Sequence, residues 1–74
     1  MTLDQARKGS MVRILAIPDA QQRAQLIRFG VDEGSSVRCA ERFPLGPTVL
    51  QCRRQEIALG RSLARRIEVR EEVG

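Results

Sequence analysis

Turn-forming residues recur at short intervals along this chain and limit the length of every element between them. Glycine, proline and small polar residues, which are typical of turns, occur at Gly9-Ser10, Pro18-Asp19, Gly30, 32–34, 44–47 and Gly60. Five intervening segments are rich in Val, Ile and Leu, namely MVRILAI, SVRCAERF, TVLQCRR, EIAL and RIEVRE. This pattern predicts five short strands.

One segment, DAQQRAQLIRFG, has the pattern of a helix. Asp19 is placed to accept hydrogen bonds from the first free amides, and Gln22, three residues later, is placed to reach back in a capping box. One face follows the spacing i, i+4 and i+7 and is formed by Ala20, Ala24 and Ile27. Gly30 can adopt the left-handed conformation that ends many helices, so we expect a helix over residues 20–29.

The length of the chain allows one hydrophobic core, so residues 1–74 are expected to form a single domain. A second helical turn is expected in RSLARR, with Ser62 as its cap and Leu63 turned inward. Five strands with one or two short helices predict a mainly β fold, in which the sheet bends into a small five-stranded β-barrel. A core of this size leaves a thin margin of stability, which a homodimer or a partner would raise.

The apolar runs are too short to cross a membrane. The longest covers residues 14–17, whereas a bilayer needs roughly 20 residues. The first ten residues, MTLDQARKGS, lack the apolar stretch and cleavage site of a secretion signal. We therefore expect a cytoplasmic protein.

The residue types that usually carry catalysis are sparse. The chain has no histidine, the side chain most often used for proton transfer near neutral pH. Its nine acidic residues show no spacing that marks a carboxylate pair, and IPDAQ before the helix is not a phosphate-binding glycine loop. The sequence therefore predicts a protein that is not an enzyme and that needs no cofactor.

Two cysteines lie on either side of the predicted hairpin turn. If the turn is centred between Leu45 and Gly46, Cys39 and Cys52 face each other across the two strands, close enough for a disulfide or for half of a thiolate metal site. Four ligands would be needed for zinc, and no histidine is present to complete the set. We favour the simpler interpretation that both are buried, reduced, small apolar side chains, and keep them as weak metal candidates.

Arginine gives the chain a net charge of +4. Such a charge permits an anionic partner, whether nucleic acid, a membrane surface or an acidic protein, but selects none of them. The two aromatic residues, Phe29 and Phe43, form no stacking platform for bases. Alternating charges in RRIEVREE are typical of a solvated strand face, so no nucleic acid is expected.

The loop FPLGP is unusually stiff, because proline fixes φ and lowers the entropy of the unfolded chain. Such a loop would hold Phe43 and Leu45 in a set position, either exposed as a docking knob or with Leu45 covering the end of the barrel. Protein binding is the function that these residues favour.

Nearly the whole chain, residues 3–70, resembles the bacterial FeoA family. The similarity lies in LIRFGVDEGSSV, in FPLGPTVLQC, and in EIALGRSLARRIEV with its Ile57, Ala58, Leu59, Ala64, Ile67 and Val69. One departure is Gly60, where the family often has a charged residue.

This resemblance implies an SH3-like barrel that docks on and regulates FeoB, the membrane transporter with a cytoplasmic GTP-binding domain, in ferrous iron uptake. A membrane would then be met only through that partner. The same barrel is the C-terminal domain of iron-dependent repressors, so the alternatives are a free-standing regulatory or metal-responsive module and a basic nucleic-acid-binding module. The family has no catalytic residues to carry over. From the loop and the outward helix positions we expect the partner-binding residues to be Gln25, Arg28, Phe43, Leu45 and Pro47.

Overall fold

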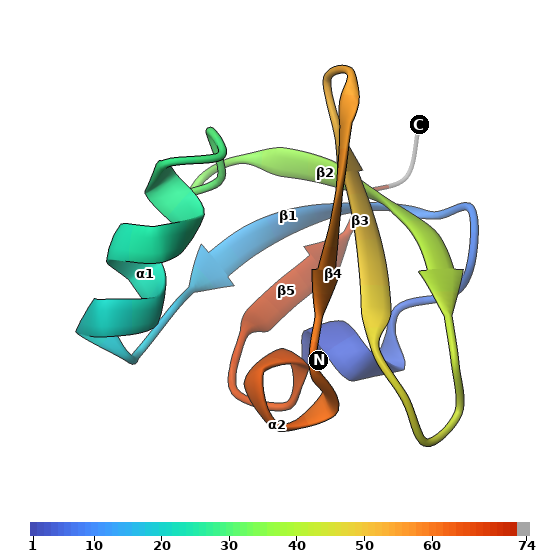
Figure 1. Ribbon diagram of the computed structural model, residues 1–74. Helices are drawn as coiled ribbons and strands as arrows, with labels where there is room; N and C mark the ends of the chain where they lie inside the picture. The colour runs from blue at the N-terminus through green and yellow to red at the C-terminus, as the bar shows by residue number, and fades with distance from the viewer. Residues whose placement is uncertain (73–74) are drawn as a thin grey trace.

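The computed structural model describes residues 1–72 and contains the five predicted strands, two short α-helices and a 3₁₀ turn (Figure 1). In chain order these are η1 Leu3–Gln5, β1 Met11–Ala16, α1 Ala20–Ile27, β2 Ser36–Arg42, β3 Thr48–Cys52, β4 Gln55–Leu59, α2 Arg61–Ala64 and β5 Glu68–Glu71. No helix within residues 1–72 has the length and apolar character needed to traverse a bilayer.

The strands form one antiparallel sheet in the order β4-β3-β2-β1-β5. The mainly β fold is therefore confirmed, with one difference from the predicted barrel: β4 and β5 are the two edges and are not hydrogen-bonded to each other, so the curled sheet stays open. The outer edge of β5 is covered by the start of the chain, because Val69 N donates to Met1 O at 2.8 Å and Leu3 N donates to Ile67 O at 2.9 Å. The edge of β4 has no such strand beside it within the described residues.

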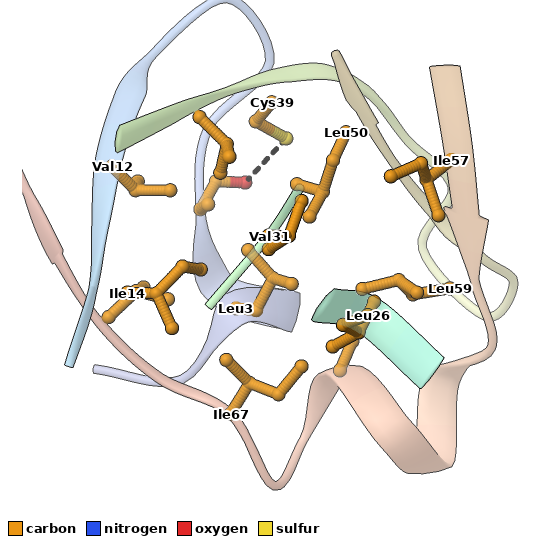
Figure 2. Packing of buried hydrophobic residues seen from close by; sticks show 14 of the residues in the cluster. Leu3, Val12, Ile14, Leu26, Val31, Cys39, Leu50, Ile57, Leu59 and Ile67 are labelled. Atoms are coloured by element: carbon orange, nitrogen blue, oxygen red, sulfur yellow. Dashed lines mark hydrogen bonds between the residues drawn. The ribbon is translucent and has the colours of Figure 1, made fainter. Parts of the chain in front are cut away.

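The core fills the inside of the curled sheet (Figure 2). Each strand contributes alternate residues, as a half-buried strand must, and η1, α1, α2 and the segments beside them close the open sides. The buried apolar residues include Leu3, Val12, Ile14, Leu26, Val31, Val37, Cys39, Leu50, Ile57, Leu59, Ile67 and Val69.

Helix α1 begins where the sequence predicts but turns a different face to the core. Asp19 Oδ1 accepts from the amides of Gln21 and Gln22, both at 3.0 Å, and Gly30 has the expected positive φ of 82°. The face of Ala20, Ala24 and Ile27 is exposed, because the helix covers the sheet through Leu26, one position away.

Replacing Asp19 by alanine is expected to lower the free energy of unfolding by about 1 kcal/mol, since two amides at the helix start lose their acceptor. Asp19→Asn keeps an acceptor oxygen and is expected to lie within about 0.5 kcal/mol of the wild type. Urea denaturation followed by circular dichroism measures both. Equal losses in the two variants would contradict this account of the cap.

The N-cap of helix α2 lies two residues earlier in the chain than predicted. Gly60, not Ser62, is the N-cap, and it makes no side-chain bond. Ser62 is exposed within the helix, while Ala64 is buried and Leu63 packs partly against the core. The expected cap is therefore wrong, whereas the inward position of Leu63 is confirmed in part.

The predicted facing of the two cysteines is also wrong. Cys39 lies opposite Leu50, and Cys52 lies opposite Gln55 on β4. The pairing of β2 with β3 shifts between Cys39 and Glu41, and such a bulge changes which residues face each other. Both cysteines are free and buried, as the simpler interpretation predicts.

Candidate docking surface

A groove runs along the open edge of the sheet, between β4, α1 and the start of α2. Its volume is about 390 Å³, and its lining combines apolar side chains from three elements with a few polar ones: Gln22, Gln25, Leu26, Phe29, Glu56, Ile57, Ala58, Leu59, Gly60 and Leu63. Phe29 is 45% exposed here. We call this surface the β4 groove.

The backbone of β4 supplies the polar part of the β4 groove. Cys52 and Gln55 are paired across a two-residue turn, and such a turn is closed by a hydrogen-bonded pair. Because antiparallel strands alternate their bonding direction, the N–H and C=O groups of Glu56 and Ala58 then point away from β3. These groups form an unpaired edge that can accept another strand.

One side-chain atom in the groove is buried without a hydrogen-bond partner. Gln22 Oε1 is inaccessible to solvent and accepts no bond within the described residues. The capping box that the sequence predicted would have used this oxygen, but only its Asp19 half forms. A buried acceptor of this kind costs free energy while it stays unpaired.

Two polar contacts position α1 and the segment that follows it. Gln55 Nε2 donates to Phe29 O at 3.0 Å, which ties the end of the helix segment to the first residue of β4. Arg23 Nε donates to Asp32 Oδ1 at 2.8 Å, and this bond is the main reason why the pKa of Asp32 lies below its usual value. The first of these bonds joins the two walls of the groove, and the second holds α1 against the loop that follows it.

The structure divides the five predicted partner-binding residues between two surfaces. Gln25 lines the β4 groove, and Arg28 follows it on the exposed side of α1's end. Phe43, Leu45 and Pro47 are exposed in the loop between β2 and β3, on the opposite side of the molecule from α1 (Figure 1). The five residues therefore do not form one continuous patch.

Hydrogen bonds hold the loop of residues 43–47 in a set shape, as its prolines suggest. Phe43 N donates to Pro47 O at 3.2 Å, and Gly46 N donates to Phe43 O at 3.0 Å. Leu45 is 81% exposed and Phe43 is 51% exposed. The loop therefore presents its apolar side chains to solvent, and Leu45 does not cover the end of the sheet.

No group of three or more side chains suited to metal binding is present within residues 1–72. Cys39 Sγ lies 3.9 Å from Ala6 O, inside the core (Figure 2). Burial raises the pKa of the Cys39 thiol, and the charge of Arg42 offsets part of that effect. A protonated, buried thiol is a poor metal ligand and a poor nucleophile.

The sequence reasoning missed three parts of the groove: the orphan oxygen of Gln22, the exposed ring of Phe29 and the free edge of β4. Only the strand itself had a signal in the sequence: EIAL alternates polar or small residues with large apolar ones, as a strand with one buried face does. The other two depend on how α1 meets the sheet, which no local pattern specifies.

Comparison with known proteins gives a consistent result. The model of the FeoA domain matches residues 1–71. A crystal structure described as an iron uptake regulatory protein, FeoA, is similar to this chain with a TM-score of 0.84 and 25% identity, over 97% of each chain. The NMR structure of a FeoA-like protein from Clostridium acetobutylicum has the same fold, with a TM-score of 0.79 and 21% identity, over 100% of this chain and 88% of that one. No curated protein matches. Because the family model covers nearly the whole sequence, the chain belongs to the FeoA domain family.

Proposed function

We propose that this chain is a cytoplasmic accessory protein that docks on the cytoplasmic domain of the FeoB transporter and regulates it. Membership of the FeoA family implies involvement in ferrous iron uptake. The family consists of small accessory proteins and is not known for enzymes. A solved relative described as regulatory supports a regulatory role here.

The observation that carries this proposal is the unpaired edge of β4 beside an apolar groove. An extended segment of the partner would add to β4 as a sixth strand, bonded to the outward N–H and C=O groups of Glu56 and Ala58. Apolar side chains on one side of that segment would fill the space near Phe29 and Leu63.

The test is to measure binding of the purified chain to FeoB's cytoplasmic domain by titration calorimetry. Ala58→Pro removes the outward N–H and is tolerated by an edge strand because that N–H makes no bond to β3. We expect it to weaken binding at least about tenfold, since one backbone hydrogen bond and the approach of the added strand are lost. Ala58→Ser keeps the N–H and is the matched control, expected to bind like the wild type.

A third variant separates this proposal from docking through the β2–β3 loop. Leu45→Asp changes the most exposed apolar side chain of the loop and leaves β4 intact. Equal binding by the wild type and Ala58→Pro, with loss in Leu45→Asp, would move the docking surface to the loop. Absence of binding by the wild type would reject the transporter as partner.

A further inference from the structure

A second surface lies at the end of the molecule that carries α2. Helix α2, η1 and the loop of residues 43–47 all lie at the lower end of the view in Figure 1, away from the β3–β4 turn at the top. Contacts join α2 to η1, and Arg42 Nε donates to Asp4 O at 2.7 Å, which joins the loop side to η1. We call these three neighbouring segments together the α2 end.

The α2 end carries positive charge that the protein does not neutralise itself. The side-chain cations in ion pairs within residues 1–72 are Arg7, Lys8, Arg13 and Arg23. The exposed arginines on and after α2, Arg61, Arg65 and Arg66, are not among them. Two nearby carboxylates are already paired, Glu68 with the N-terminal ammonium at 3.5 Å and Glu41 with Lys8 Nζ at 3.0 Å, and Asp4 accepts a bond from the Thr2 hydroxyl.

Two of these arginines share a small hollow with a hydroxyl group. Ser62, Arg65 and Arg66 line a surface pocket of about 300 Å³. Two arginines and a serine lining one hollow suit the oxygens of a phosphate group, because arginine can bind phosphate with two parallel hydrogen bonds.

The loop adds an apolar element to the same end. Leu45 and Phe43 are held outward on a turn that also contains Pro44 and Pro47, and a Cβ added to Gly46 would lie only 3.2 Å from Phe43 Cβ. An apolar tip and cationic groups at the same end of a molecule are the pattern of proteins that rest on a membrane surface, where the tip enters the headgroup layer and the cations meet lipid phosphates.

We propose that the α2 end binds the surface of a bilayer that contains anionic phospholipids, with Arg65, Arg66 and Ser62 holding a headgroup phosphate and Leu45 entering the headgroup layer. This contact is direct and does not depend on the docking proposed for β4. It departs from the expectation that the chain meets a membrane only through its partner. Nucleic acid also offers phosphates to the arginines, but it offers the exposed Leu45 no apolar environment. A lipid surface suits both the arginines and Leu45.

The contact is expected to be weak and reversible. Each arginine near an anionic surface contributes about a fivefold gain in partitioning. Removing Arg65 and Arg66 together is therefore expected to lower partitioning about 25-fold, and the remaining binding should fall as salt is added.

The experiment measures sedimentation of the full chain with vesicles of phosphatidylcholine alone and of phosphatidylcholine mixed with phosphatidylglycerol. We expect binding only to the mixed vesicles, lowered more than tenfold in Arg65→Gln/Arg66→Gln and lowered further when Leu45→Ser is added. The matched control is Arg53→Gln/Arg54→Gln, which removes the same charge from an adjacent exposed pair on the β3–β4 turn, at the other end of the molecule. It is expected to bind within about twofold of the wild type.

Three results would overturn the proposal. Equal losses in the two double variants would mean that net charge, and not the α2 end, attracts the vesicles. Binding of single-stranded RNA that depends on Arg65 and Arg66, without binding to mixed vesicles, would assign the surface to nucleic acid. Shifts of the α2 amide signals with inorganic phosphate, again without vesicle binding, would make it a site for a free anion. Circular dichroism of each variant confirms that the fold is retained.

Discussion

Leu3→Asp is expected to leave no cooperatively folded protein. Leu3 has an exposed fraction of 0% and packs at the centre of the core (Figure 2). A carboxylate there would be buried without a partner, which costs several kcal/mol, and the stability of a single-core domain of this length is of that size. A thermal melt followed by circular dichroism is expected to show no unfolding transition.

The same substitution at Leu45 is the matched control. Leu45 is 81% exposed, so aspartate at this position stays hydrated and is expected to change the free energy of unfolding by less than about 0.5 kcal/mol. A cooperative melt in Leu3→Asp, or a large loss in Leu45→Asp, would contradict the division between core and surface described above.

Cys39 is expected to react with a thiol reagent at least about 100-fold more slowly in the folded protein than in urea, because the side chain must be exposed by unfolding before it reacts. The measurement uses a Cys52→Ala background, so that Cys39 is the one thiol, and follows the absorbance of Ellman's reagent. Fast reaction in the folded state would show that Cys39 is accessible and would reopen its role as a metal ligand.

The free energy of unfolding should also depend on pH through the protonation of Cys39. Since the pKa of this thiol is raised in the folded state, the folded protein holds the proton to higher pH than the unfolded chain does. The resulting stabilisation is complete below the ordinary cysteine range and is lost as pH rises through the raised pKa. In the Cys39→Ala variant this alkaline loss should disappear.

Local patterns predicted most of the fold because each strand carries its own signals. Turn residues, alternation and β-branched side chains located the five strands, and Asp19 and Gly30 located the ends of the helix segment. These features act over a few residues and need no knowledge of the rest of the chain. The order of the strands in the sheet is not local, and no pattern in the sequence predicted it.

Features that depend on long-range packing were not predicted correctly. The buried face of α1 is set by where Leu26 meets the sheet, although Ala20, Ala24 and Ile27 have the better helical spacing. The facing of Cys39 and Cys52 failed for two reasons: beside the turn Arg42 pairs with Thr48, one residue away from the expected register, and the bulge in β2 then shifts the pairing by one more. The five expected partner-binding residues lie on two surfaces, because α1 and the loop at Phe43 are on opposite sides of the molecule. No local pattern in the sequence specifies this.

The unequal edges of the sheet also limit how the molecule can assemble. Met1 and Leu3 occupy the β5 side, so within residues 1–72 only the β4 side can be extended. A second copy joining there, edge to edge about a twofold axis, would use up that side on both molecules and stop growth at two. Fibre-like stacking, which needs two open sides per molecule, is thereby disfavoured, and a homodimer would compete directly with any other strand donor.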